Sequence, residues 1–251
     1  MTITQNSGAV PQSIAVFGAG PGLGQAVARR YAREGYAVVL VARRQKPLDL
    51  LAEELVADGT TAHVITADLS DTDAVAPLAE RIRARVGNPD AFYYGPAGSD
   101  TGFTRATTLT PRQAQDFMPL AFSTLLALVQ EFLPHMIQRG HGAILTAQGA
   151  SAVLGMPGRS GPGPALAAQR NYLQSLHAEV AEKGVHIGRL YIGAAIESSA
   201  FHADMEKARA AGTSVPQWPT VDPAHLADLL WTMHTTKGQP EVIYPAGFLG
   251  H

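Results

Sequence analysis

The sequence predicts an α/β protein whose doubly wound, seven-stranded parallel sheet is flanked by helices on both faces. Short, apolar, β-branched runs alternate with longer helical patterns along the whole chain, as expected for repeated βα units. The runs are continuously apolar, which is typical of parallel strands covered on both faces. A glycine-rich turn directly after the first run is a third indication of this fold class.

Seven runs are expected to be the strands, joined by right-handed helical crossovers. They are, in chain order, SIAVFG at 13–18, AVVLVA at 37–42, TAHVIT at 61–66, AFYY at 91–94, GAILTA at 142–147, VHIGRLYI at 185–192 and EVIY at 241–244. The segment GMPGRSGPGP at 155–164 holds four Gly and three Pro, so it is expected to be a loop. Pro119 should kink the helix in which it lies.

The composition is that of an ordinary globular chain. With 251 residues, 46% hydrophobic and 16% charged, it can bury one large core, and we expect a single domain over 1–251 with a mobile tail over 1–12. A net charge of −2 with scattered signs predicts neither a nucleic-acid partner nor a membrane surface. No cysteine and no signal-peptide pattern are present, which favours a cytoplasmic location. No histidines have metal-ligand spacing, so no metal site is expected.

A glycine-rich segment, GAGPGLG at 18–24, follows the first expected strand and precedes the helical run QAVARRYAREG. Glycines let the chain turn tightly and bring main-chain N–H groups, at the positive end of a helix, against a diphosphate. Such turns also occur as plain packing devices, but the flanking strand and helix favour a dinucleotide site. The fold is therefore expected to be Rossmann-like.

The spacing of Gly18, Gly22 and Gly24 resembles the Gly-x-x-x-Gly-x-Gly motif of the short-chain dehydrogenase/reductase family. The commoner dinucleotide fingerprint needs Gly or Ala where Leu23 stands. The resemblance extends over nearly the whole chain and implies a nicotinamide dinucleotide cofactor. The residues that it places at this cofactor are Gly18, Gly20, Gly22, Leu23, Gly24, Arg43, Arg44, Asp68, Leu69, Gly95 and Gly193.

The end of the second strand indicates which dinucleotide is bound. In the family, an acidic residue here binds the adenosine ribose hydroxyls, whereas an Arg receives a 2′-phosphate. Ala42 occupies the acidic position and Arg43 follows it. A guanidinium can donate two charge-assisted hydrogen bonds to a phosphate, so NADP(H) is the expected cofactor. Solvated surface remains the alternative for these cations, as an N-cap does for Asp68.

The resemblance stops at the catalytic residues. When the flanking segments are matched, the family's helix Asn falls on Ala121 and its catalytic Ser on Gly149. Its Tyr and Lys fall on Pro162 and Leu166. All four roles are therefore expected to be vacant.

A polar contact of the family is also missing. The family's strand-ending Asn-Asn-Ala-Gly is replaced within YYGPAG at 93–98, and its Thr before the glycine loop is Phe17. Because both partners are lost together, nothing need be left unsatisfied, and we expect Phe17 and Tyr94 to fill the space. Tyr94 is also a weak candidate for a substitute acid, with a core aromatic as the alternative.

These vacancies limit the chemistry. In the family, the Tyr donates a proton as hydride arrives, which is worth roughly 10²- to 10⁴-fold in rate. We therefore expect hydride transfer from NADP(H) to a small organic substrate that can accept hydride without proton donation by the enzyme, such as an iminium ion or a conjugated alkene. The alternative is an inactive homologue that serves as an NADP(H) sensor or as a partner subunit. A non-redox catalyst is disfavoured because the nucleotide motifs are kept.

The helices at 111–138 and 165–182 resemble those that pair in dimers of the family. The stretch ALAAQRNYLQSLHAEVA contains small residues that let helices approach closely. A homodimer or homotetramer is therefore expected.

Overall fold

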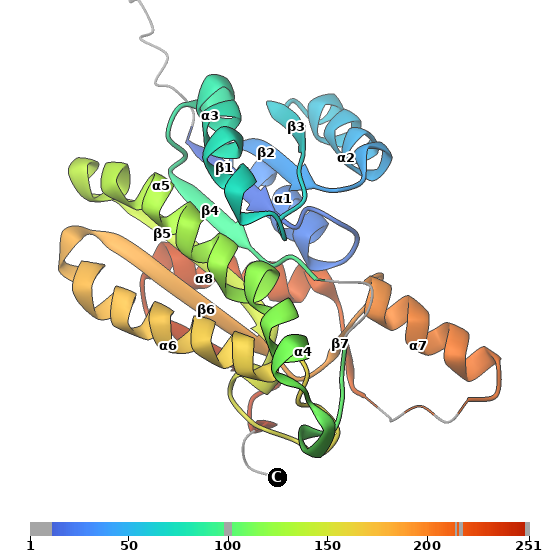
Figure 1. Cartoon of the computed structure of the whole chain (residues 1–251). Coiled ribbons are helices and arrows are strands. Elements are labelled where there is room, and N and C mark those ends of the chain that lie inside the picture. Colours follow the sequence, from blue (N-terminus) through green and yellow to red (C-terminus); the bar gives the residue numbers. More distant parts are fainter. Residues whose placement is uncertain (1–11, 98–101, 214, 216–217, 249–251) are drawn as a thin grey trace, which may run out of the picture.

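The computed structural model describes residues 12–97, 102–213, 215 and 218–248 (Figure 1). Its centre is one seven-stranded sheet with the order β3-β2-β1-β4-β5-β6-β9, in which every neighbouring pair is parallel. The chain winds outward from β1 in one direction and from β4 in the other. The predicted fold class is confirmed. The tail expected over 1–12 lies, except for Gln12, outside the described residues.

The strands of this sheet agree closely with the apolar runs. Their bounds are β1 Ser13–Phe17, β2 Ala37–Ala42, β3 Ala62–Thr66, β4 Ala91–Tyr94, β5 Gly142–Gly149, β6 Val185–Ile192 and β9 Glu241–Tyr244. Strands β1, β4 and β6 are buried along their whole length, because helices cover both faces of the sheet.

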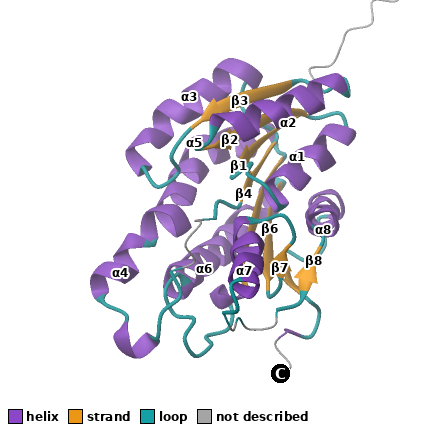
Figure 2. Ribbon diagram, turned by 90° about the vertical axis from the view of Figure 1, so that its right-hand side faces the viewer, coloured by secondary structure: helices purple, strands orange, loops and turns teal. Residues whose placement is uncertain are grey.

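Six helices form the two outer layers (Figure 2). On one face, α1 (Leu23–Arg33), α2 (Gln45–Ala57) and α8 (Pro223–Thr236) bury their apolar stripes in one core cluster. On the other, α3 (Val75–Val86), α5 (Thr124–Arg139) and α6 (Gly163–Val180) bury theirs in a second. The two layers hold the sheet rigidly, so its carboxyl edge can present loops at fixed positions.

Three features differ from the sequence prediction. A second, two-stranded sheet pairs β7 (Ala195–Ile196) with β8 (Thr220–Val221), and α7 (Ala200–Ala210) extends from it away from the main sheet (Figure 1). The loop expected over 155–164 ends earlier, because α6 begins at Gly163. Proline in a first helical turn costs no hydrogen bond, so Pro164 fits there.

The helix around Pro119 is interrupted, as the proline predicts. Helix α4 (Pro111–Asp116) ends before it, and residues Pro119–Ser123 form a π-helical segment that leads into α5. Single π turns are frequent at functional sites because they leave main-chain carbonyls free for other donors.

Within the described residues, one helical run, 111–139, is long and apolar enough to cross a membrane by length and composition alone. Its buried residues include Leu125, Leu128 and Phe132, which pack against the sheet. A core helix of a globular protein gives the same signal.

Candidate functional site

The glycine-rich loop lies at the carboxyl edge of the sheet, at the point where the chain changes direction. β1 has β2 on one side and β4 on the other, and the crevice outside such a switch point is where open α/β sheets bind their ligands. Residues 18–22 connect β1 to α1 at this place, and Leu23 and Gly24 begin the helix.

At each of the three positions of the spacing motif, a steric constraint explains why the residue is glycine. Gly18 and Gly22 have φ angles of +95° and +92°, which side-chain-bearing residues rarely adopt. A Cβ on Gly24 would lie 1.9 Å from the Gly18 carbonyl oxygen. The start of α1 can therefore pack against the loop only because position 24 has no side chain.

Gly20 differs, because nothing lies within 4 Å of a Cβ built on it and its φ is not positive. The space above the loop is therefore open. In the described chain, the amides of Leu23 and Gly24 have no acceptor, since the first bonds of α1 are made by Gln25 and Ala26. The Leu23 side chain is buried in the core, so only its amide can serve a ligand.

The end of β2 concentrates positive charge. Arg43 and Arg44 are exposed and form no ion pair in the described chain, and Arg44 stands at the N-terminus of α2, whose first turn has no acidic residue. A helix N-terminus favours anions, so two cations here leave a local excess of positive charge. A phosphate group would neutralise it.

Asp68 lies near this cationic end. Hydrogen bonds from the main chain and the hydroxyl group of Ser70 lower the pKa of Asp68, and the charge of Arg43 lowers it further. The alternative that Asp68 caps the next helical turn is wrong, because Asp71 accepts that hydrogen bond from Asp73. The exposed Asp68 carboxylate keeps its second oxygen for another partner.

Three other residues predicted at the cofactor are more enclosed. The Leu69 side chain is buried in the core, which leaves only its main chain. Gly95 donates its amide to Phe17, and a Cβ on it would collide with the Tyr93 hydroxyl at 2.0 Å. A Cβ on Gly193 would collide with the Phe248 ring at 2.3 Å. These glycines therefore lie directly against aromatic side chains.

The positions matched to the family's catalytic residues converge beyond β5. Gly149 ends the strand and is exposed, and a Cβ built on it would lie 3.6 Å from the Ser151 hydroxyl oxygen. Pro162 directly precedes α6. An added Cβ on Gly163 would lie 3.3 Å from the Ser151 carbonyl oxygen, so the start of α6 lies close to the end of β5.

The other two positions are enclosed in an apolar cluster. Leu166 packs with Ala152 and Tyr191, and Ala121 lies against the same group. The Ala121 carbonyl, which lies in the π-helical segment, accepts a hydrogen bond from the buried side-chain amide of Gln169. Sequence reasoning missed Gln169, although a glutamine four residues before Leu173 on the apolar stripe of α6 was a usable signal.

The proposal that Tyr94 is a substitute acid is wrong. Its side chain is fully buried, and its hydroxyl donates to the Leu120 carbonyl at 2.5 Å. Burial raises the pKa of Tyr94 well above 10. The repacking prediction is confirmed, since the rings of Phe17 and Tyr94 lie 6.5 Å apart in one aromatic group with Phe92 and Phe132.

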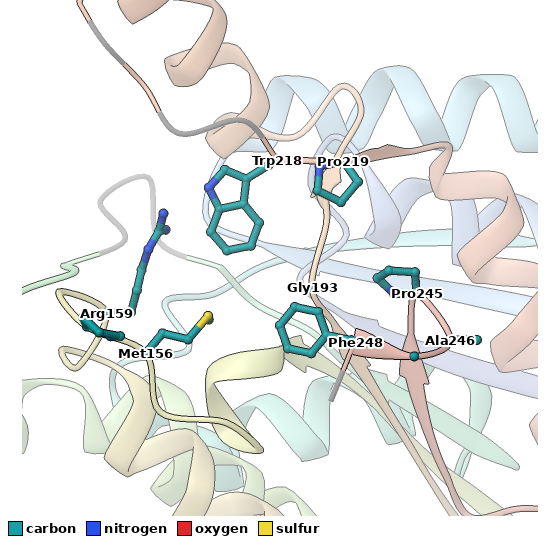
Figure 3. A pocket seen from close by; sticks show the side chains of 10 residues that line it. Met156, Arg159, Gly193, Trp218, Pro219, Pro245, Ala246 and Phe248 are labelled. Carbon is teal, nitrogen blue, oxygen red and sulfur yellow. The ribbon is translucent and has the colours of Figure 1, made fainter. Parts of the chain in front are cut away.

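A cavity of about 550 Å³ opens beside Gly193 at the carboxyl edge of the sheet (Figure 3). Its walls are mainly apolar and aromatic and include Met156, Trp218 and Phe248, with Arg159 as its charged residue. Clefts of this size and character typically bind small organic molecules. In the described chain, no three His, Asp or Glu side chains group in a way that could hold a metal ion.

The family profile described as short chain dehydrogenase matches residues 12–208. The chain belongs to this family. The match covers the glycine loop, the four residues that the sequence comparison aligned with the family's catalytic positions, and the cavity residues Arg159 and Gly193.

Curated relatives and solved structures agree with this membership. The chain is 30% identical over 180 residues to a fatty acyl-CoA reductase from Acinetobacter baylyi, covering 70% of this chain and 60% of that protein. It is 24% identical over 186 residues to a 3-oxoacyl-[acyl-carrier-protein] reductase from Staphylococcus aureus, covering 72% of this chain and 74% of that one. The chain thus spans 60% of the length of the Acinetobacter relative.

Two solved structures have the same fold. An NADPH-bound short chain oxidoreductase from Pseudomonas aeruginosa, described as containing an atypical catalytic center, has a TM-score of 0.78 at 20% identity, covering 95% of this chain and 98% of that chain. L-sorbose reductase from Gluconobacter frateurii, complexed with NADPH and L-sorbose, has a TM-score of 0.77 at 19% identity, covering 94% and 95%.

Proposed function

We propose that this protein is an NADP(H)-dependent oxidoreductase that transfers a hydride to a small organic substrate without a tyrosine–lysine acid of its own. The observation that carries the proposal is the pair of cations, Arg43 and Arg44, at the end of β2 beside an open glycine loop. The chain also has no carboxylate at position 42 that could bind ribose hydroxyls instead.

The residues present fit such a dinucleotide. The unpaired amides of Leu23 and Gly24 would hold the diphosphate, and the open space above Gly20 would admit it. Arg43 would receive the 2′-phosphate, and the second oxygen of Asp68 would be available on the adenine side. When bound, NADPH supplies a hydride.

In this proposal, the residues at the family's catalytic positions and Tyr94 do not serve as proton donors. Ala121, Gly149, Pro162 and Leu166 cannot ionise, and Tyr94 is committed to a carbonyl. The exposed Gly149 leaves the end of β5 accessible to water. Hydride acceptors whose product charge is already stabilised, such as iminium ions and conjugated alkenes, suit this arrangement because orientation alone can accelerate their reduction.

The relatives support the proposal without defining the substrate. The Pseudomonas aeruginosa oxidoreductase combines NADPH binding with a catalytic center described as atypical, so the two properties occur together in this fold. The Acinetobacter baylyi relative is named a fatty acyl-CoA reductase but is matched over 60% of its length.

Single-turnover oxidation of bound NADPH by a panel of carbonyls, imines and enones, followed from pH 6 to 10, tests the proposal. We expect an enone, or a quaternary iminium ion that has no proton to lose, to oxidise NADPH at a rate that does not decline at alkaline pH. NADPH that binds at micromolar concentration but is oxidised by no compound would favour the sensor or partner subunit. Simple ketones turning over at about 1–10³ s⁻¹ would show that the catalytic residues are present elsewhere.

A further inference from the structure

Arg159 occupies a fixed position in the loop that joins β5 to α6. Its amide donates to the Met156 carbonyl at 3.1 Å, and the next amide, of Ser160, donates to Thr104 at 2.9 Å. The loop is therefore held at both sides of Arg159, and the side chain is directed by a defined backbone.

The Arg159 guanidinium lies between two aromatic rings from distant parts of the chain. Its central carbon is 4.8 Å from the centre of the Phe103 ring and 4.4 Å from that of Trp218. Trp218 in turn contacts Phe201 of α7, with ring centres 6.3 Å apart. Figure 3 shows the Arg159 side chain beside Trp218 at the rim of the cavity. Contacts of this kind are made by the face of a guanidinium, so they do not use its N–H donors.

This cation has no acidic partner among the described residues. Other partly buried arginines, such as Arg83 and Arg170, pair with carboxylates of Glu131 and Glu241. Arg159 forms no such pair, and burial lowers its pKa. A partly desolvated charge without a counterion is costly in a folded protein, so the site would be stabilised by an anion supplied from outside.

We propose that the cavity binds organic monocarboxylates and that Arg159 is the residue that selects them. The carboxylate would take both N–H donors of the guanidinium edge, and a flat unsaturated body would lie against Trp218 and Phe248. This rests on the proposed function in one respect, since the same cavity borders Gly193, which the family resemblance places at the cofactor.

The single charge favours a carboxylate over a phosphate ester. Arg159 is the charged residue lining the cavity, and the remaining described walls are Gly, Ala, Pro, Met and aromatic residues. One guanidinium neutralises a monoanion but would leave a phosphate dianion with uncompensated charge in an apolar cleft.

The test uses two isosteric probes and the native fluorescence of Trp218. In a Trp231→Phe background, 4-formylbenzoate and the neutral 4-formylbenzamide are titrated into the full chain with and without NADPH. We expect the carboxylate to bind at least tenfold more tightly than the amide. Arg159→Gln should abolish this preference, and Arg159→Lys should keep part of it, because the charge remains while the two-donor edge is lost.

Several outcomes would overturn the inference. Equal affinity of the two probes in the Trp231→Phe protein, with Arg159 intact, would contradict the proposal. An Arg159→Gln change that weakens the binding of both probes equally would contradict it too. NADPH affinity is the control and should be unchanged in Arg159→Gln. If NADPH does not bind at all, the proposed function fails, whereas a retained preference for the carboxylate would still support the cavity assignment.

Discussion

The hydroxyl group of Tyr94 donates a 2.5 Å hydrogen bond to the main-chain carbonyl of Leu120, inside the π-helical segment that follows Pro119. A tyrosine of strand β4 thus donates to a main-chain carbonyl of the π-helical segment. In the same segment, the carbonyl of Ala121 accepts a hydrogen bond from the side-chain amide of Gln169. The break in the helix is thus stabilised by side chains from the sheet and from α6.

Tyr94→Phe should lower the free energy of unfolding by about 1–3 kcal/mol, because the partly buried Leu120 carbonyl loses its donor. It should not change the pH profile of NADPH oxidation, since the hydroxyl lies in the core. Urea unfolding and single-turnover kinetics measure the two effects. Tyr172→Phe is the control, because Tyr172 is a half-buried tyrosine that packs edge-to-face against Phe122. A profile altered by Tyr94→Phe alone would restore this tyrosine as a candidate acid.

Arg43→Ala should remove most of the preference for NADPH over NADH. A charge-assisted contact is worth about 1.5–3 kcal/mol, which corresponds to at least tenfold in affinity for NADPH and no change for NADH. Isothermal titration with both cofactors measures this. Arg33→Ala, an exposed arginine at the far end of α1, is the matched control. Equal affinities for the two cofactors in unmutated protein would contradict the assignment of Arg43.

The loop glycines allow a paired test of structure against binding. Gly24→Ala should lower both thermal stability and NADPH affinity, because its methyl group would collide with the Gly18 carbonyl. Gly20→Ala should leave stability unchanged, since the position is open, but should weaken NADPH binding by filling the space above the loop. If Gly20→Ala leaves NADPH affinity unchanged, the dinucleotide does not lie above this residue.

Acid should destabilise the fold through two histidines. Burial is the main cause that lowers the pKa of both His186 and His234 from 6.5 to about 4. As pH falls from 6.5 towards 4, the unfolded chain binds protons that the folded chain does not, so the free energy of unfolding falls. Each histidine contributes up to about 1.4 kcal/mol per pH unit in this window. The loss is complete below pH 4, where both states are protonated.

Urea unfolding at pH 5 and pH 7 measures this effect. His186→Leu should reduce the difference between the two values, whereas His135→Asn, at an exposed position of α5, should not. An unchanged pH dependence in His186→Leu would show that other groups cause the acid sensitivity.

We propose that α5 and α6 pair with a second copy of the chain. The apolar run that includes α5 has only part of its surface in the core, and residues such as Leu126 remain partly exposed. Light scattering should therefore report a particle heavier than the 26.5 kDa chain, and Leu126→Lys should dissociate it. Leu50→Lys on α2, where the side chain is 58% exposed, should not. A 26.5 kDa particle at micromolar concentration would contradict the prediction.

Local patterns predicted the sheet and the glycine loop because both depend on neighbouring residues. Apolar runs of four to eight residues identify buried strands, and a strand-to-helix turn needs glycine at defined spacings. The two-residue strands β7 and β8 were missed because two residues carry no periodicity. The proline predicted a break at Pro119, but its π geometry depends on Tyr94 and Gln169.

The cavity could not be predicted, since its residues meet only through the fold. Arg159 was read as one residue of a Gly- and Pro-rich loop, and its ring partners Phe103 and Trp218 lie far from it in the sequence. The role of Tyr94 was misjudged for a similar reason. Its partner, the Leu120 carbonyl, is 26 residues away in the sequence and meets it only through the fold.

The apolar cluster around Leu166 limits which side chains the start of α6 can carry. A lysine at this position would place its ammonium group among Ala152, Tyr191 and Ala121, where an unpaired charge is strongly disfavoured. Replacing Leu166 with lysine would therefore damage the fold before it could help any reaction. The exposed loops at the carboxyl edge of the sheet, such as the one that carries Arg159, can accept a new polar side chain at a much lower cost in stability.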